Sequence, residues 1–168
     1  GQVAKIICSF PRSADAKVFT DLYLAGGIEL EIVPQGTLAE RMRAAGAGIP
    51  AFYTPTSYGT DLATGKPVAE FDGRMYVQER ALKADFALIK AQQGDLMGNL
   101  TYRMAARNFN PVMATAAAVT IAQVSHVVAP GDLDPENVVT PGIFVNRVVH
   151  VPNPQQEEVL NRQEAVYP

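Results

Sequence analysis

Residues 28–41 read IELEIVPQGTLAER and place an expected strand directly before an expected helix. Ile28–Val33 alternates apolar and acidic side chains, which is typical of a strand with one solvated face. Thr37 and Glu40 have the spacing of a capping box, so we expect Thr37 to cap a helix that ends near Gly46. This strand-to-helix step is the unit from which α/β folds are built.

Strands and helices continue to alternate on both sides of this unit. The patterns predict strands at Val3–Ser9, Asp85–Gln92, 119–128 and 143–151. They also predict a glycine-ended helix at 14–26, a hairpin turn at Asp72-Gly73 and a short helix from Pro111. We therefore predict an α/β fold, with an open, mostly parallel sheet and flanking helices in residues 1–150. Residues 151–168 are expected to form a polar tail.

Composition excludes several functional classes. The 168 residues are 48% hydrophobic and carry 14 Lys+Arg against 17 Asp+Glu, so no basic face for nucleic acid or an anionic membrane is expected. Membrane spans need about 18–20 consecutive apolar residues, and no run of that length occurs. A single cysteine, Cys8, rules out an internal disulfide framework and suits the cytoplasm.

Most residue types that could carry chemistry have a simpler structural interpretation. His126 and His150 do not form a metal-ligand pair, and Cys8 is interpreted as a small core residue within a strand. The glycines match neither a Walker loop nor a dinucleotide fingerprint. We therefore expect no metal, no cofactor and no nucleophile in this chain.

Gln35 is the one side chain in a setting suited to catalysis. It lies between Pro34 and Gly36, at the expected start of a helix whose free N–H groups carry partial positive charge. Its amide could donate to a developing negative oxygen. The alternative is an ordinary residue in a strand-to-helix connection. The glycine-rich residues 46–60 are expected to form a loop.

Three blocks resemble the A subunit of the class I 3-oxoacid coenzyme A transferases. They are residues 29–60 (ELEIVPQGTLAERMRAAGAGIPAFYTPTSYGT), 84–111 (ADFALIKAQQGDLMGNLTYRMAARNFNP) and 140–149 (TPGIFVNRVV). The resemblance extends from about Val3 to Val149. Residues 8–12 (CSFPR) and 131–149 are most similar to family members that act on 3-oxoadipate in aromatic breakdown by the β-ketoadipate route.

The resemblance implies half of an enzyme that exchanges CoA between succinyl-CoA and a 3-oxoacid. In this family a glutamate of the partner B subunit reacts with the acyl-CoA and carries CoA as a glutamyl thioester, so CoA is a substrate carrier. It implies an α2β2-type heteromer in which Gln35 stabilises the oxyanion. Further substrate-binding residues are expected in the cleft: Gly36, Gly46, Gly48, Phe52 and Tyr53.

Arg12 is our own addition to this expected site. Its guanidinium is expected to bind the distal carboxylate that 3-oxoadipate has and acetoacetate lacks. The alternative is a solvated surface arginine.

The sequence departs from the family pattern at one end, and two alternative functions stay open. Family members of the A type begin with a longer segment containing GGFG and, later, an Asn-Asn-Ala-Gly block, so this chain is expected to be incomplete at its N-terminus. The acceptor could be acetoacetate in place of 3-oxoadipate. The chain could also be a non-catalytic ligand-binding module of the same fold.

Overall fold

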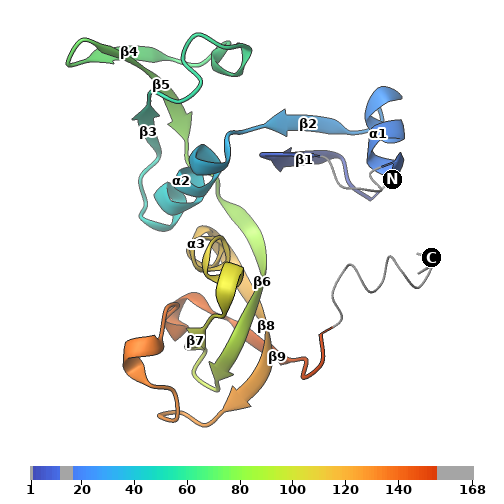
Figure 1. Cartoon of the computed structure of the whole chain (residues 1–168), viewed down its shortest axis with the longest axis vertical. Coiled ribbons are helices and arrows are strands. Elements are labelled where there is room, and N and C mark those ends of the chain that lie inside the picture. The colour runs from blue at the N-terminus through green and yellow to red at the C-terminus, as the bar shows by residue number, and fades with distance from the viewer. Residues whose placement is uncertain (1, 12–16, 155–168) are drawn as a thin grey trace. The chain divides into compact units, whose positions relative to one another are not determined.

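The computed structural model describes residues 2–11 and 17–154 (Figure 1). The chain divides into two compact units, and the division falls between Lys83 and Ala84. Both units combine strands with helices, which confirms the α/β class. In the described part of the chain the strands form three sheets, two in the first unit and one in the second. Among the described residues, no helix is both long and apolar enough to cross a membrane.

The first sheet is a parallel pair joined by a helix. Strand β1 (Lys5–Cys8) pairs with β2 (Glu29–Ile32), from Lys5 opposite Glu29 to Cys8 opposite Ile32, and α1 (Lys17–Leu24) precedes β2. The acidic face of β2 is paired with a cation, because the Lys5 Nζ lies 2.8 Å from Glu29 and 2.9 Å from Glu31. The predicted strand-helix-strand order is confirmed here.

Helix α2 (Gln35–Gly46) begins earlier than the capping-box pattern predicted. Pro34 is the N-cap, with φ −53° and ψ 139°, and its carbonyl accepts a hydrogen bond from Leu38 N–H at 2.8 Å. Thr37 is therefore inside the first turn, where its hydroxyl cannot cap the helix. A capping box also needs an N–H on the N-cap residue, which proline lacks. The capping-box prediction was wrong for both reasons.

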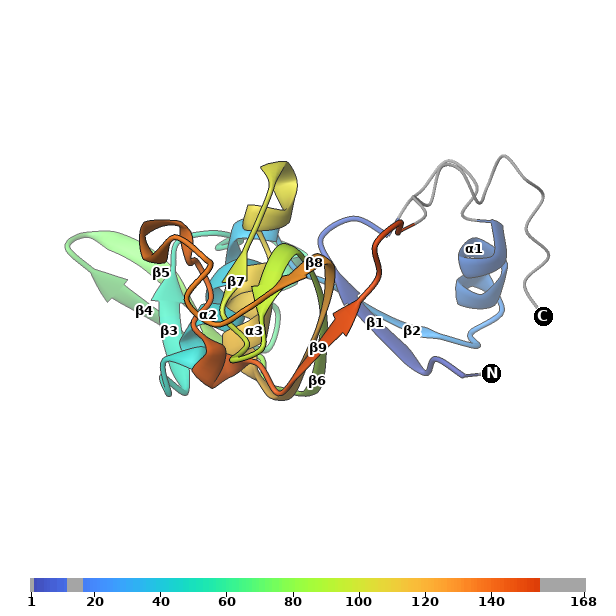
Figure 2. The same cartoon turned by 90° about the horizontal axis from the view of Figure 1, so that it is seen from below.

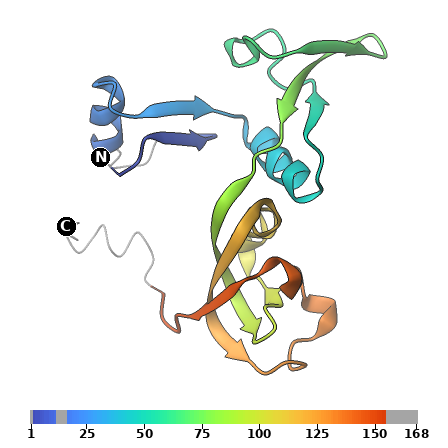
Figure 3. The same cartoon turned by 180° about the vertical axis from the view of Figure 1, so that it is seen from behind.

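The second sheet is antiparallel, in the order β3-β5-β4. Strands β3 (Ala51–Thr54), β4 (Val68–Phe71) and β5 (Arg74–Arg80) form it, and α2 lies beside β3 and β5 (Figure 3). Asp72 and Gly73 join β4 to β5 with φ of 51° and 74°, which is a type I′ turn and confirms the predicted hairpin. The expected continuous loop over residues 46–60 was wrong, because β3 lies within it. A short 3-10 turn, Asp61–Ala63, follows.

The second unit contains one four-stranded sheet in the order β7-β6-β8-β9 (Figure 2). Strands β6 (Ala84–Asp95), β8 (Ala117–Val128) and β9 (Arg147–His150) are parallel, and β7 (Leu100–Thr101) is antiparallel to β6. Helix α3 (Asn110–Ala116) connects β6 to β8 across one face. Three 3-10 turns complete the unit: Met104–Arg107, Pro135–Asn137 and Gly142–Phe144.

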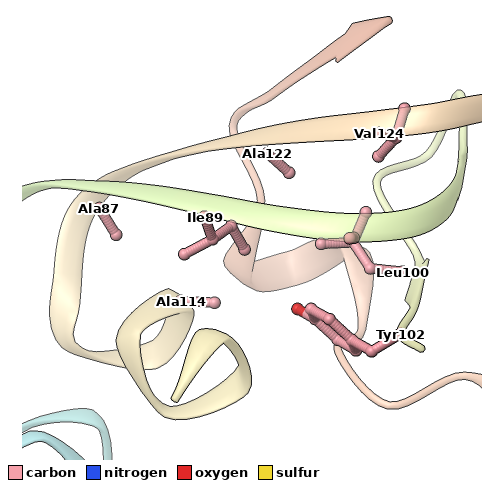
Figure 4. Packing of buried hydrophobic residues seen from close by; sticks show 8 residues of the cluster. Ala87, Ile89, Leu100, Tyr102, Ala114, Ala122 and Val124 are labelled. Carbon is pink, nitrogen blue, oxygen red and sulfur yellow. The ribbon is translucent and has the colours of Figure 1, made fainter. Parts of the chain in front are cut away.

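The core of the second unit lies between this sheet and α3 (Figure 4). Its buried side chains are Ala87, Ile89, Ala91, Leu100, Tyr102, Ala114, Ala122 and Val124. Alternate residues of β6 point away from that core, and Phe86 and Leu88 are 64% and 72% exposed. The strand predicted at Asp85–Gln92 is confirmed within β6, and the described residues cover only one of its faces.

A hydrogen-bonded turn closes β6. Asp95, only 2% exposed, accepts hydrogen bonds from Met97 N–H at 2.9 Å, Asn99 N–H at 2.8 Å and Asn99 Nδ2 at 2.8 Å. The Asn99 Oδ1 accepts from Gly142 N–H at 2.9 Å, so the same turn holds the loop before β9. A Cβ atom at Gly142 would overlap the Met97 carbonyl oxygen, which explains why glycine stands there.

Candidate active site

The first turn of α2 forms one wall of the candidate site. Pro34 ends the β2 connection with a fixed φ, so the chain enters the helix at Gln35. Gln35 and Gly36 lie nearer the surface than Thr37, which is buried. Among the described residues no side chain caps α2, so the first-turn N–H groups keep their partial positive charge and remain available to a ligand.

A cavity of about 340 Å³ lies between this turn and β3. Its lining combines hydroxyl, apolar and carboxylate groups: Pro34, Gly36, Thr37, Ala39, Glu40, Phe52, Thr54 and Thr56. Two residues predicted from the sequence, Gly36 and Phe52, are therefore brought together here. Gln35 lies between two lining residues, at the first position of α2.

Tyr53 lies on the other face of β3 from Phe52. Its ring meets Phe71 edge-on at 5.2 Å between centroids, and its hydroxyl accepts a hydrogen bond from Gln78 Nε2 at 3.3 Å. Successive side chains of a strand point to opposite faces, so adjacent residues cannot both line this cavity. Tyr53 is thus placed in the antiparallel sheet, apart from the cavity lining.

Gly46 and Gly48 lie at the far end of α2, which at 12 residues is about 18 Å long. Gly48 has φ +73°, and the N–H groups of Gly48 and Ile49 donate to Ala45 and Ala44 at 3.2 and 2.8 Å. This is a Schellman motif, which gives Gly48 a helix-ending role. Neither glycine lines the cavity. Arg12, the predicted ligand of a distal carboxylate, is outside the described residues.

The sequence pattern alone did not reveal four polar residues of the lining, Thr37, Glu40, Thr54 and Thr56. The alternation of side chains along a strand would have predicted part of this set. Residues 52, 54 and 56 are alternate positions at and just after the end of β3, so their side chains are expected on the same face as Phe52. Thr37 was assigned to capping, and this hid its place in the wall.

An ionic network fixes α2 relative to its neighbouring strands. Arg41 Nη1 lies 2.7 Å from Glu31 of β2, and Arg41 Nε donates to the carbonyl of Arg80 of β5 at 2.9 Å. The hydrogen bond from Arg41 lowers the pKa of Glu31 below its ordinary value against the opposing effect of burial, and Lys5 adds to the lowering. The helix that carries Gln35 is therefore held by hydrogen bonds on two sides.

Two further cavities lie in the second unit. One, of about 460 Å³, is lined by the end of β6 and the loop after β8, including Asp95 and Asn99. The other, of about 390 Å³, lies on the exposed face of the β6-β8-β9 sheet. Within residues 2–11 and 17–154, no three His, Cys, Asp or Glu side chains come together as metal ligands would.

The family model described as coenzyme A transferase matches residues 1–151. The chain belongs to the coenzyme A transferase family. It is 68% identical to the A subunit of 3-oxoadipate CoA-transferase from Acinetobacter baylyi, and the match covers 90% of this chain and 66% of that protein. It is 66% identical to the protein of the same name from Pseudomonas putida, with 90% and 65% covered.

Relatives named as succinyl-CoA:3-ketoacid coenzyme A transferases share lower sequence identity with this chain. The chain is 53% identical to the A subunit of a probable succinyl-CoA:3-ketoacid coenzyme A transferase from Mycobacterium tuberculosis, with 84% of this chain and 64% of that protein covered. The chain spans about two thirds of the length of these curated relatives.

Solved structures agree with the family fold. An acyl-CoA transferase of Escherichia coli O157:H7, in a thioester complex with CoA, has a TM-score of 0.76 at 25% identity, over 89% of this chain and 34% of that one. Glutaconate coenzyme A-transferase of Acidaminococcus fermentans reaches 0.78 at 22% identity, over 90% and 56%. The decarboxylase AibA/AibB reaches 0.74 at 26% identity, over 89% and 58%. The fold alone therefore does not choose between transfer and decarboxylation.

Proposed function

We propose that this chain is the A subunit of a CoA-transferase that moves CoA from succinyl-CoA to 3-oxoadipate. The observation that carries the proposal is the difference in sequence identity between two groups of relatives. Two proteins named as 3-oxoadipate CoA-transferases are 68% and 66% identical, against 53% for one named for 3-ketoacids. A cytoplasmic heterotetramer with the B subunit, in the breakdown of aromatic compounds, belongs to the same proposal.

In the proposed reaction the nucleophile comes from the B subunit. Its glutamate carboxylate attacks the thioester carbonyl of succinyl-CoA, the C–S bond breaks, and CoA leaves as the thiolate. The thiolate then attacks the glutamyl carbonyl of the mixed anhydride and releases succinate, which leaves CoA on the enzyme as a thioester. The acceptor carboxylate reverses the same steps, so each bond broken is matched by one formed.

The contribution of this chain is a donor for the oxyanion formed in each attack. Gln35 fits that role because it is the first residue of α2, where the uncapped helix terminus favours negative charge. The ion pair of Glu31 and Arg41 holds the helix in place. Gly36 and Phe52 supply the adjacent wall. Roles for Gly46, Gly48, Tyr53 and Arg12 in substrate binding stay predictions.

The experiment that tests the proposal is a reconstitution. The chain is purified alone and with its B subunit, and CoA transfer from succinyl-CoA is measured with 3-oxoadipate and with acetoacetate. Activity only in the pair, with 3-oxoadipate preferred, is the expected result. Preference for acetoacetate would contradict 3-oxoadipate as the acceptor and would favour a succinyl-CoA:acetoacetate transferase. Ligand binding by the chain alone, with no transfer in the pair, would favour a binding module.

A further inference from the structure

One face of the antiparallel β3-β5-β4 sheet is open and carries aromatic side chains. Side chains alternate along each strand, so this face, which we call the aromatic face, carries six large residues: Tyr53, Phe71, Arg74, Tyr76, Gln78 and Arg80. Tyr53 and Phe71 are 37% and 45% exposed. On the opposite face of β5, Val77 and Glu79 are only 0% and 3% exposed. The described residues therefore cover one face of this sheet and leave the other to solvent.

The rings on the aromatic face are held in fixed positions. An antiparallel sheet with one face in water normally carries polar residues on that face. Here the Phe71 ring meets Tyr53 edge-on at 5.2 Å and Tyr76 at 5.4 Å between centroids. Gln78 Nε2 donates to the Tyr53 hydroxyl at 3.3 Å, and the Arg74 guanidinium lies 6.0 Å from the centre of the Tyr76 ring. Tyrosine, phenylalanine and arginine are enriched in protein–protein interfaces, and rings fixed in advance lower the ordering cost of binding.

The aromatic face is also positively charged. Arg74 and Arg80 are exposed, and neither forms an ion pair within the described residues. The carboxylates of the same strands, Glu70 and Glu79, lie on the opposite face, where Glu79 is 2.6 Å from Lys66 Nζ. A second copy of this chain bound through the same face would bring like charges together. A partner with carboxylates around an apolar patch would complement both the guanidinium groups and the rings.

We propose that this chain binds its B subunit through the aromatic face, at a patch of the B subunit where carboxylates surround apolar side chains. The inference rests on the proposed function, which makes this chain the A subunit of a heteromer and supplies the partner. Phe71 contacts both tyrosines and is the aromatic anchor at the centre of the surface. Arg74 and Arg80 are the charged rim, which orients the partner during the encounter.

The test measures the association rate and the Kd of this chain with its purified B subunit by surface plasmon resonance. Phe71→Ala should weaken binding about tenfold or more, because aromatic anchors at the centre of an interface carry most of its binding energy. Arg74→Glu combined with Arg80→Glu should lower the association rate about tenfold at low salt and reduce its dependence on ionic strength. This double variant changes only exposed side chains and keeps the three rings, so it tests the face even if Phe71→Ala fails to fold.

Two variants away from the aromatic face are matched controls. Val68→Ala truncates an exposed apolar side chain on the opposite face of β4, and Arg103→Glu reverses an exposed arginine in the second unit. Both should bind the B subunit with the Kd of the wild type.

The outcomes separate this inference from the proposed function. An active pair in which Phe71→Ala and the double arginine variant bind like the wild type overturns the inference and leaves the proposed function standing. Self-association of the chain alone that Phe71→Ala abolishes would assign the aromatic face to a second copy and overturns the inference. Association that does not slow as salt is added contradicts the acidic patch and overturns it too. A pair that binds through the aromatic face but transfers no CoA overturns the proposed function and leaves the docking surface standing.

Discussion

Replacing Asp95 with alanine should destabilise the second unit strongly. The Asp95 carboxylate is 2% exposed and accepts three hydrogen bonds at 2.8 to 2.9 Å, from Met97 N–H, Asn99 N–H and Asn99 Nδ2. Hydrogen bonds to charged groups contribute about 1.5–3 kcal/mol each. The carboxylate borders a cavity of about 460 Å³ that water can enter, so the freed donors are partly satisfied. We expect a loss of about 3 kcal/mol, near the value of the strongest single bond.

The assay is urea unfolding of the purified chain. The sequence contains no tryptophan, so circular dichroism and tyrosine fluorescence are the signals, and the buried Tyr102 reports on the second unit. Asp95→Asn keeps one oxygen for the two backbone donors and turns an amide toward Asn99 Nδ2, so it should lose about 1–2 kcal/mol. Asp134→Ala is the matched control, because Asp134 also accepts from Glu136 N–H and Asn137 Nδ2, but in an exposed turn.

Two results would refute this reasoning. A loss below about 1 kcal/mol in Asp95→Ala would mean that water replaces the carboxylate at no cost. Equal losses in Asp95→Ala and Asp134→Ala would mean that burial adds nothing to the turn.

Three further predictions follow from the site, the core and the ionic network. Gln35→Ala should lower kcat of the heteromer about 10²- to 10³-fold with little change in KM, and steady-state kinetics showing an unchanged kcat would contradict the oxyanion role. Leu100→Ala should cost about 3 kcal/mol of unfolding free energy in urea titrations, because Leu100 is fully buried; a loss under about 1 kcal/mol would mean that the core collapses around the gap. Arg41 lowers the pKa of Glu31 in the folded state. The ionised Glu31 therefore stabilises the fold fully above the pKa of an unfolded glutamate, about 4.3, and this stabilisation is lost as the pH falls through the lower pKa of the folded state. The difference in unfolding free energy between wild type and Glu31→Gln should therefore be constant near neutral pH and shrink in acid, whereas a difference that grew in acid would reverse the sign.

Local signals in the sequence predicted the elements that depend on a few neighbouring residues. Asp72-Gly73 predicted a hairpin because a type I′ turn needs positive φ at two adjacent positions, and both residues tolerate it. The alternation of Ile28–Val33 predicted a strand that the structure confirms as Glu29–Ile32. These features need no knowledge of the tertiary structure.

Predictions failed where two local signals conflicted or where contacts between distant segments determined the structure. Pro34 set the start of α2, and its missing N–H made a capping box impossible, although Thr37 and Glu40 have the spacing. The sequence predicted two of the residues that line the cavity, and their roles in binding stay predictions. Gly36 and Phe52 line the cavity, whereas Tyr53 faces Phe71 because strand parity separates neighbours. Which face of β3 meets α2 depends on packing between distant segments, which no local pattern encodes.

The order of strands along the chain bears on folding during synthesis. The sheets of the first unit are complete once residue 80 has been made, because β5 is their last strand. The sheet of the second unit gains β9 only at residues 147–150, so β8 has an unpaired edge while that segment is still in the ribosome. Parallel pairing between distant strands is slow, and open edges favour aggregation. A released chain that ends before Arg147 lacks β9 and leaves this edge of β8 unpaired, so residues 1–146 should aggregate more readily than residues 1–168.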